Sequence, residues 1–230
     1  MNNVFYWKFK MSQKIIIVGS GNAALTAGIA SLEKGAEVTI YEKADKKMAG
    51  GNTKYTAGAM RFSYESGDQL IDLLNNPNDI RLKDTDFGSY TQEQFKNDLL
   101  DFNNGRPLSW EQEILVSKSL ETIKWLSSHD IKFEPIYSRQ SFIKDGKHIF
   151  WGGLTLASEN EGVGLFNQEL SAFLSLGGKI FYESPVTDLI FQDNKVKGIC
   201  LDKNKIEADA VILASGGFEA NDDLRKSFME

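Results

Sequence analysis

Residues 15–24 read Ile-Ile-Ile-Val-Gly-Ser-Gly-Asn-Ala-Ala, and this stretch decides the fold of the 230-residue chain. The aliphatic run 15–18 is typical of a short strand that is covered on both faces in a parallel sheet. Apolar positions then recur at helical spacing from Asn22 to Lys34, and Gly35 ends the pattern. A second strand is predicted over 37–41, which closes a strand–helix–strand unit of about thirty residues. The stretch therefore predicts an α/β fold with a parallel central sheet.

The turn between the first strand and the helix has the spacing of a dinucleotide-binding motif. A glycine at 19 permits a tight turn, a glycine at 21 lets the backbone approach a pyrophosphate, and the small Ala24 lets helix and strand pack closely. The phosphates would face the positive end of the helix dipole. Glu42 ends the second strand, where a carboxylate can accept hydrogen bonds from both hydroxyls of a ribose. These residues predict a Rossmann-type domain; the alternative is a glycine turn of another α/β protein, with Glu42 merely on its surface.

A loop rich in small residues follows the acidic strand and indicates which dinucleotide is bound. Gly50-Gly51-Asn52-Thr53 and Thr56-Ala57-Gly58-Ala59-Met60 stand where a nicotinamide dehydrogenase would enter its next strand–helix unit. Small residues let the main chain lie against a broad planar ring, and main-chain amides can bond its polar edge. This composition favours a flavin, and a flexible surface loop is the alternative.

The rest of the chain is expected to add a small helical insert and a β-meander. Helical spacing predicts the insert over about 90–135, and another helix over 165–176. Four β-rich runs follow, and turn residues at 192–195 and 202–205 make the middle runs an antiparallel meander. The predicted runs are 179–182, 187–191, 196–201 and 210–214.

Composition and charge exclude several classes of protein. Twenty-six basic and thirty-two acidic residues give a net charge of -6, so a nucleic acid partner is not expected. One cysteine and two histidines are too few for a disulfide or a protein-only zinc site, so we expect no metal and a cytoplasmic protein. The uncharged run 15–32 is long enough to span a membrane, but residues 19–22 interrupt it at the predicted turn. No membrane span is predicted, and residues 1–13 are interpreted as an N-terminal extension.

Several segments resemble one flavoprotein family. Gly50 to Lys54, Ala57 to Met60 and Ala208 to Phe218 are similar to the FAD-binding half of the fumarate reductase and succinate dehydrogenase flavoprotein superfamily. The insert 90–133 and the run 150–154 most resemble its tricarballylate dehydrogenase branch. The resemblance implies that 14–230 form a Rossmann-type FAD-binding domain. In relatives a capping domain follows the counterpart of 216–217; it is absent here, so the chain is expected to be an N-terminal fragment, truncated before that domain.

The resemblance also implies which residues contact FAD. Around the adenosine and pyrophosphate it implies Gly19, Ser20, Gly21, Asn22, Ala23, Ala24, Glu42, Lys43, Ala44 and the backbone of Val186. Along the flavin and over the cofactor it implies Gly50, Gly51, Asn52, Thr53, Thr56, Ala57, Gly58, Ala59, Ala214, Ser215 and Gly216. In respiratory members a histidine stands in place of Thr53 and bonds covalently to the flavin, so FAD is expected to be non-covalent here.

The chemistry implied by the resemblance is hydride transfer between flavin N5 and a small di- or tricarboxylate. An electron acceptor or donor is also required, and the sequence leaves it open. In relatives the catalytic groups follow the counterpart of 216–217, so none is nominated within 1–230. Arg61 is the one candidate for holding a substrate carboxylate, against the ordinary alternative of a salt bridge. The rival hypotheses are a 3-ketosteroid dehydrogenase-like flavoenzyme and a truncated FAD- or nucleotide-binding module without turnover.

Overall fold

The computed structural model describes residues 12–229, and the chain falls into two compact units. The first unit comprises Met1–Gly51 and Leu170–Glu230, and the second comprises Asn52–Glu169. Of the predicted N-terminal extension, only Ser12 and Gln13 lie within the described residues.

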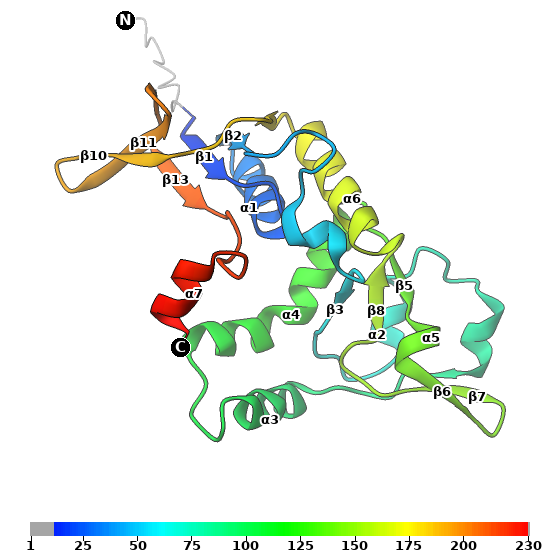
Figure 1. Ribbon diagram of the computed structural model, residues 1–230. Helices are drawn as coiled ribbons and strands as arrows, with labels where there is room; N and C mark the ends of the chain where they lie inside the picture. The colour runs from blue at the N-terminus through cyan, green and yellow to red at the C-terminus, as the bar shows by residue number, and fades with distance from the viewer. Residues whose placement is uncertain (1–11, 230) are drawn as a thin grey trace, which may run out of the picture. The chain divides into compact units, whose positions relative to one another are not determined.

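A four-stranded parallel sheet forms the centre of the first unit, as the sequence predicts (Figure 1). Its order is β13-β1-β2-β9, and every neighbouring pair is parallel. Ile17 of β1 is opposite Ile212 on one side and Ile40 on the other, which explains why these strands are aliphatic. The strands are β1 (Lys14–Val18), β2 (Glu37–Tyr41), β9 (Lys179–Phe181) and β13 (Ala210–Leu213).

Helix α1 of the first unit begins and ends close to its predicted positions, whereas α6 begins earlier than predicted. Helix α1 (Asn22–Glu33) follows β1, and α7 (Asp222–Phe228) starts after an Asn221 cap. Helix α6 (Glu161–Ser175), which contains the boundary between the units, starts four residues before the predicted 165. The added turn contains Gly162, where a Cβ would collide with the Thr53 carbonyl oxygen.

The meander of the first unit contains one strand more than expected. Strands β10 (Asp188–Gln192), β11 (Lys195–Leu201) and β12 (Asn204–Glu207) form an antiparallel sheet in that order. The sequence prediction placed a turn over 202–205, whereas β12 already begins at Asn204. Ile199 of β11 packs with Ile16, Tyr41 and Ala208, which joins the meander to the parallel sheet.

The second unit contains α3 (Gln92–Phe102) and α4 (Trp110–Ser128), as the predicted insert requires. Beside these helices, the second unit contains two three-stranded sheets, β3-β8-β5 and β4-β7-β6. The strands are β3 (Ala59–Met60), β4 (Thr85–Asp86), β5 (Phe133–Pro135), β6 (Ser141–Lys144), β7 (Lys147–Phe150) and β8 (Leu156–Ser158). The short helices are η1 (Gly51–Tyr55), which begins in the first unit, α2 (Asp68–Ile71), η2 (Ile80–Asp84) and α5 (Tyr137–Gln140).

A separate core holds the second unit together. Phe62, Tyr64 and Phe133 are fully buried in it, together with Val116 and Ile123 from α4. Both long helices start with a capping box, in which Thr91 pairs with Gln94 and Ser109 pairs with Gln112. Across residues 12–229, the structure contains no helix that is both long enough and apolar enough to cross a membrane.

Candidate cofactor site

The carboxyl ends of three parallel strands bring the main predicted segments together in the first unit. Gly19 follows β1, Glu42 follows β2 and Ala214 follows β13, and these strands are neighbours in the sheet. The Gly19 amide donates to the Tyr41 carbonyl (2.9 Å), and the Ala214 amide donates to the Val18 carbonyl (2.9 Å). Ligands of open α/β sheets bind at this edge, so the sheet places these residues where a cofactor is expected.

The backbone at Gly19 does not accept a side chain. Its φ is +97°, and a Cβ would lie 2.5 Å from the Ala214 carbonyl oxygen and 3.0 Å from the Ser215 Cα. Both the left-handed conformation and the close approach of two backbones require glycine. The structure therefore brings the first glycine turn against the segment after the last strand.

Helix α1 begins without a side-chain cap. Gly21 is the N-cap residue and supplies no side-chain hydrogen bond, and the first turn contains no acidic residue. Ala23 in that turn is exposed to solvent. The helix dipole favours a negative group at such an end. A pyrophosphate fits this arrangement without displacing a capping side chain.

Glu42 lies in a buried polar cluster beside the glycine turn. Its carboxylate Oε2 accepts a hydrogen bond from the Ser20 hydroxyl (2.6 Å), and Oε1 accepts one from the Ala44 amide (2.8 Å). The Ser20 Oγ in turn accepts a hydrogen bond from the Gly50 amide (3.0 Å). A carboxylate has about four acceptor positions, so two remain for hydroxyl donors such as those of a ribose.

Two glycines on the same unit border open space. A Cβ on Gly51 (φ +51°) or on Gly216 (φ +80°) would meet no atom within 4 Å. Lys43 is exposed, and the side chain of Val186 packs on the core cluster of the first unit, which leaves its backbone for any ligand contact. The open glycines, the uncapped helix and the Glu42 carboxylate fit the adenosine and pyrophosphate parts of FAD.

The predicted flavin segment 52–59 lies in the second unit, where it packs against the beginning of α6. The Thr56 carbonyl accepts a hydrogen bond from the Gly162 amide (3.1 Å), and the Gly58 carbonyl accepts one from Ser158 (3.0 Å). A Cβ on Gly58 would lie 2.7 Å from the Glu161 carbonyl carbon. Sequence reasoning missed this support for the segment, although the two glycines at 162 and 164 were a visible signal.

Arg61 is held by protein groups of the second unit. Its Nη1 donates to the Tyr90 hydroxyl (3.0 Å) and lies 3.2 Å from Asp98 Oδ2, and the Tyr90 hydroxyl also donates to Asp98 (2.6 Å). These contacts provide the salt bridge that the sequence offered as the ordinary alternative to substrate binding.

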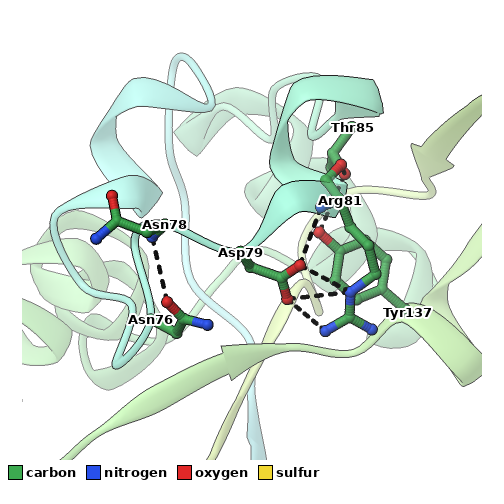
Figure 2. Close-up of polar contacts among 6 residues, drawn as sticks. All are labelled: Asn76, Asn78, Asp79, Arg81, Thr85 and Tyr137. Atoms are coloured by element: carbon green, nitrogen blue, oxygen red, sulfur yellow. Dashed lines mark hydrogen bonds and ion pairs between the residues drawn. The ribbon is translucent and has the colours of Figure 1, made fainter.

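A polar cavity of about 180 Å³ in the second unit contains no predicted site residue. Figure 2 shows its central ion pair, in which the Arg81 guanidinium binds the Asp79 carboxylate. The same guanidinium lies 4.3 Å from the Tyr137 ring centroid, and hydrogen bonds from Arg81 hold the pKa of Asp79 below its ordinary value. Since the two charges neutralise each other, we assign the pair a role in holding its loop. The cavity is lined by Leu74, Asn75, Asn76, Asp79, Arg81, Leu82, Glu134 and Pro135.

Comparison with known proteins finds relatives that are named as oxidoreductases and reductases. NADH:acrylate oxidoreductase of Vibrio harveyi is 24% identical over 265 residues, which cover 93% of this chain and 25% of that protein. Fumarate reductase (cytochrome) of Shewanella frigidimarina is 24% identical, with 91% of this chain and 34% of that protein covered. The chain thus spans a quarter to a third of the length of these two relatives.

The fold also has a counterpart among solved structures. The 3-ketosteroid-Δ4-(5α)-dehydrogenase from Rhodococcus jostii RHA1 superposes with a TM-score of 0.64 at 18% identity, covering 97% of this chain and 50% of that one. This likeness confirms the fold. The FAD binding domain family matches residues 14–230. Because that match covers nearly the whole chain, the chain belongs to the FAD binding domain family, and FAD is its cofactor.

Proposed function

We propose that this chain forms the FAD-binding part of an oxidoreductase that acts on a small di- or tricarboxylate. The observation that carries the proposal is the meeting of Gly19, Glu42 and Ala214 at the carboxyl edge of one parallel sheet, beside the uncapped start of α1. When bound, FAD supplies hydride transfer at its flavin ring.

The residues of the first unit bind the pyrophosphate and the adenosine of FAD, which do not take part in hydride transfer. The amides at the start of α1 hold the pyrophosphate, with Gly21 allowing close approach. Glu42 accepts hydrogen bonds from the adenosine ribose, and Lys43, Ala44 and Val186 border the adenosine. The segment 214–216 covers the cofactor from the last strand, next to Gly19.

The residues 50–59 run along the flavin and orient it. The Thr56 and Gly58 carbonyls are bonded to the region before and at the start of α6, so this segment has a fixed backbone within its unit. A threonine hydroxyl is a poor candidate for a bond to a flavin ring, so Thr53 supports a non-covalent cofactor.

The names of the relatives support a small carboxylate as substrate. One relative is named for acrylate and the other for fumarate, and both are small carboxylates. Within this class, tricarballylate is the substrate that the resemblance of segments 90–133 and 150–154 favours. A cytoplasmic location is part of the same proposal. The ketosteroid dehydrogenase likeness rests on the fold alone and therefore does not favour a steroid substrate.

A visible spectrum of the purified protein tests the proposal directly. We expect flavin absorbance, either at once or after incubation with FAD, and release of all flavin into the supernatant after denaturation. Glu42→Gln is expected to weaken FAD binding, whereas Glu37→Gln, at the exposed opposite end of β2, is the matched control. A protein without flavin absorbance before or after incubation contradicts the proposal.

Turnover assays then separate the rival activities. Acrylate, fumarate, tricarballylate and 4-androstene-3,17-dione are tested with an artificial electron donor or acceptor. Turnover of a carboxylate would place catalytic groups within residues 1–230, and turnover of the steroid would support the ketosteroid alternative. Bound FAD without turnover is the result expected of an FAD-binding part whose catalytic groups lie elsewhere.

A further inference from the structure

The Ser20 hydroxyl is buried between two other segments of the first unit. Ser20 is 1% exposed, and its Oγ lies 2.6 Å from Glu42 Oε2 and 3.0 Å from the Gly50 amide nitrogen. Ser20 lies in the turn after β1, Glu42 directly follows β2, and Gly50 begins the loop rich in small residues. One side chain therefore connects the glycine turn, the ribose carboxylate and the start of the predicted flavin segment.

The direction of these hydrogen bonds follows from the chemistry of the groups. The Gly50 amide can only donate, so Ser20 Oγ accepts from it and turns its own proton toward Glu42. The single hydroxyl proton is therefore donated to Glu42. The Ser20 side chain has no further proton to donate to a phosphate, so it is not expected to bind the pyrophosphate.

The remaining contacts of Glu42 fix it from the other side. Its Oε1 accepts from the Ala44 amide (2.8 Å), its own amide donates to the Phe181 carbonyl (2.9 Å), and its carbonyl accepts from the Ser184 amide (2.9 Å). The backbone is thus anchored, and Ser20 is the side chain that sets the orientation of the carboxylate. Fixed polar groups bind a ligand more tightly because less freedom is lost on binding.

We propose that Ser20 is a positioning residue for the cofactor: its hydroxyl fixes the Glu42 carboxylate for the adenosine ribose and holds Gly50 in register with it. Ser20 acts through Glu42 and not by touching FAD. This inference rests on the proposed function, because it assigns Glu42 to the ribose.

Calorimetric titration of the 230-residue protein with ADP and with 2′-deoxy-ADP tests the inference. The variants are Ser20→Ala, Glu42→Gln and the double variant. Ser31→Ala is the matched control, since Ser31 lies in α1 and its hydroxyl donates to the Ala27 carbonyl of the same helix. Ser20→Cys, which keeps a similar volume with a weak donor, is the second variant if Ser20→Ala does not fold.

We expect Ser20→Ala to weaken ADP binding about tenfold, the effect of one hydrogen bond to a charged group. The loss for 2′-deoxy-ADP is expected to be smaller, so the preference for the ribose falls, and Ser20→Ala is expected to add little in the Glu42→Gln background. A purely structural role would weaken both ligands equally.

Three outcomes would overturn the inference. Equal losses for ADP and 2′-deoxy-ADP would place the effect outside the ribose site, and additive losses in the double variant would show that Ser20 does not act through Glu42. Failure of the unmodified protein to bind ADP and FAD would remove the proposed function, and this inference with it. Binding by the unmodified protein with unchanged ribose preference in Ser20→Ala contradicts the inference alone.

Discussion

Glu42 in the first unit and Glu169 in the second are both buried, and their surroundings are opposite. Glu42 is 6% exposed, and each of its carboxylate oxygens accepts a hydrogen bond from the protein. Glu169 on α6 is 0% exposed, and neither oxygen has a hydrogen-bond partner among the described residues. Burial alone therefore does not mark a binding carboxylate; the donors around Glu42 and its place at the sheet edge do.

The neighbours of Glu169 along α6 also show that its surroundings are apolar. Leu165 and Phe166, one turn before it, and Phe173, one turn after it, are all buried. These positions share one face of a helix, so Glu169 lies in an apolar stripe. Burial without a partner raises the pKa of Glu169 from 4.5 to about 8, because the charged form is poorly solvated there.

The largest expected effect comes from Glu169→Leu. Removing a carboxyl from an apolar stripe is expected to raise the free energy of unfolding at pH 9 by up to roughly 4–5 kcal/mol, at about 1.4 kcal/mol for each pH unit between the two pKa values. Urea denaturation of both proteins at pH 9 measures it. An unchanged or lower midpoint would mean that Glu169 has a partner in solution.

In the unmodified protein, the cost of burying the charged Glu169 should make the free energy of unfolding depend on pH. Below pH 4.5 the carboxyl is protonated in both states and costs little. Between 4.5 and about 8 the unfolded chain loses the proton while the folded chain keeps it, so stability falls as pH rises. Unfolding midpoints at pH 5, 6.5 and 8 test this, and Glu169→Gln, which cannot titrate, is expected to flatten the Glu169 contribution. The same slope in both proteins would contradict this assignment.

The identical substitution at the other glutamate is expected to have the opposite result. Glu42→Leu leaves the Ser20 hydroxyl and the Ala44 amide without their acceptor, which costs about 1–3 kcal/mol for the buried hydroxyl and less for the half-buried amide. It also removes the proposed ribose acceptor, so FAD binding should weaken. Urea denaturation and FAD titration measure the two effects. If Glu42→Leu is more stable than the unmodified protein, as expected for Glu169→Leu, then the hydrogen bonds of Glu42 do not stabilise the fold.

The smallest effect is expected from an added negative charge at the start of α1, where the pyrophosphate is proposed to bind. Ala23→Glu adds an exposed carboxylate to the first turn of α1, which should stabilise the helix by about 0.3–1 kcal/mol and weaken FAD binding by repelling the pyrophosphate. Gln92→Glu makes the same change in the first turn of α3 and should give a similar stability without affecting FAD. Thermal denaturation and FAD titration of both variants provide the comparison, and equal FAD affinities would place the pyrophosphate elsewhere.

Local pattern was sufficient to predict the first unit's sheet. The aliphatic runs and turn residues predicted β2 over the observed Glu37–Tyr41 and placed α1 between β1 and β2. Gly19 and Glu42 were expected near one another because each follows a strand, and the two strands are neighbours in one parallel sheet. Such features depend on neighbours in the sequence, which is why they could be predicted.

Features that depend on distant parts of the chain could not be predicted. Strand β3 has two residues and pairs with β8, nearly a hundred residues later, so neither has a periodicity to detect. The orientation of the Ser20 hydroxyl depends on Glu42 and Gly50, which only the folded chain brings to it. Helical periodicity favours an apolar residue at 169, and the glutamate there contradicts that pattern.

Hydrogen–deuterium exchange of the protein with and without FAD reports where the cofactor binds. We expect slower amide exchange on adding FAD in segments 19–24, 42–44 and 214–216, while the amides of α3 and α4 change little. Protection confined to other segments, with 19–24 and 42–44 unchanged, would contradict it.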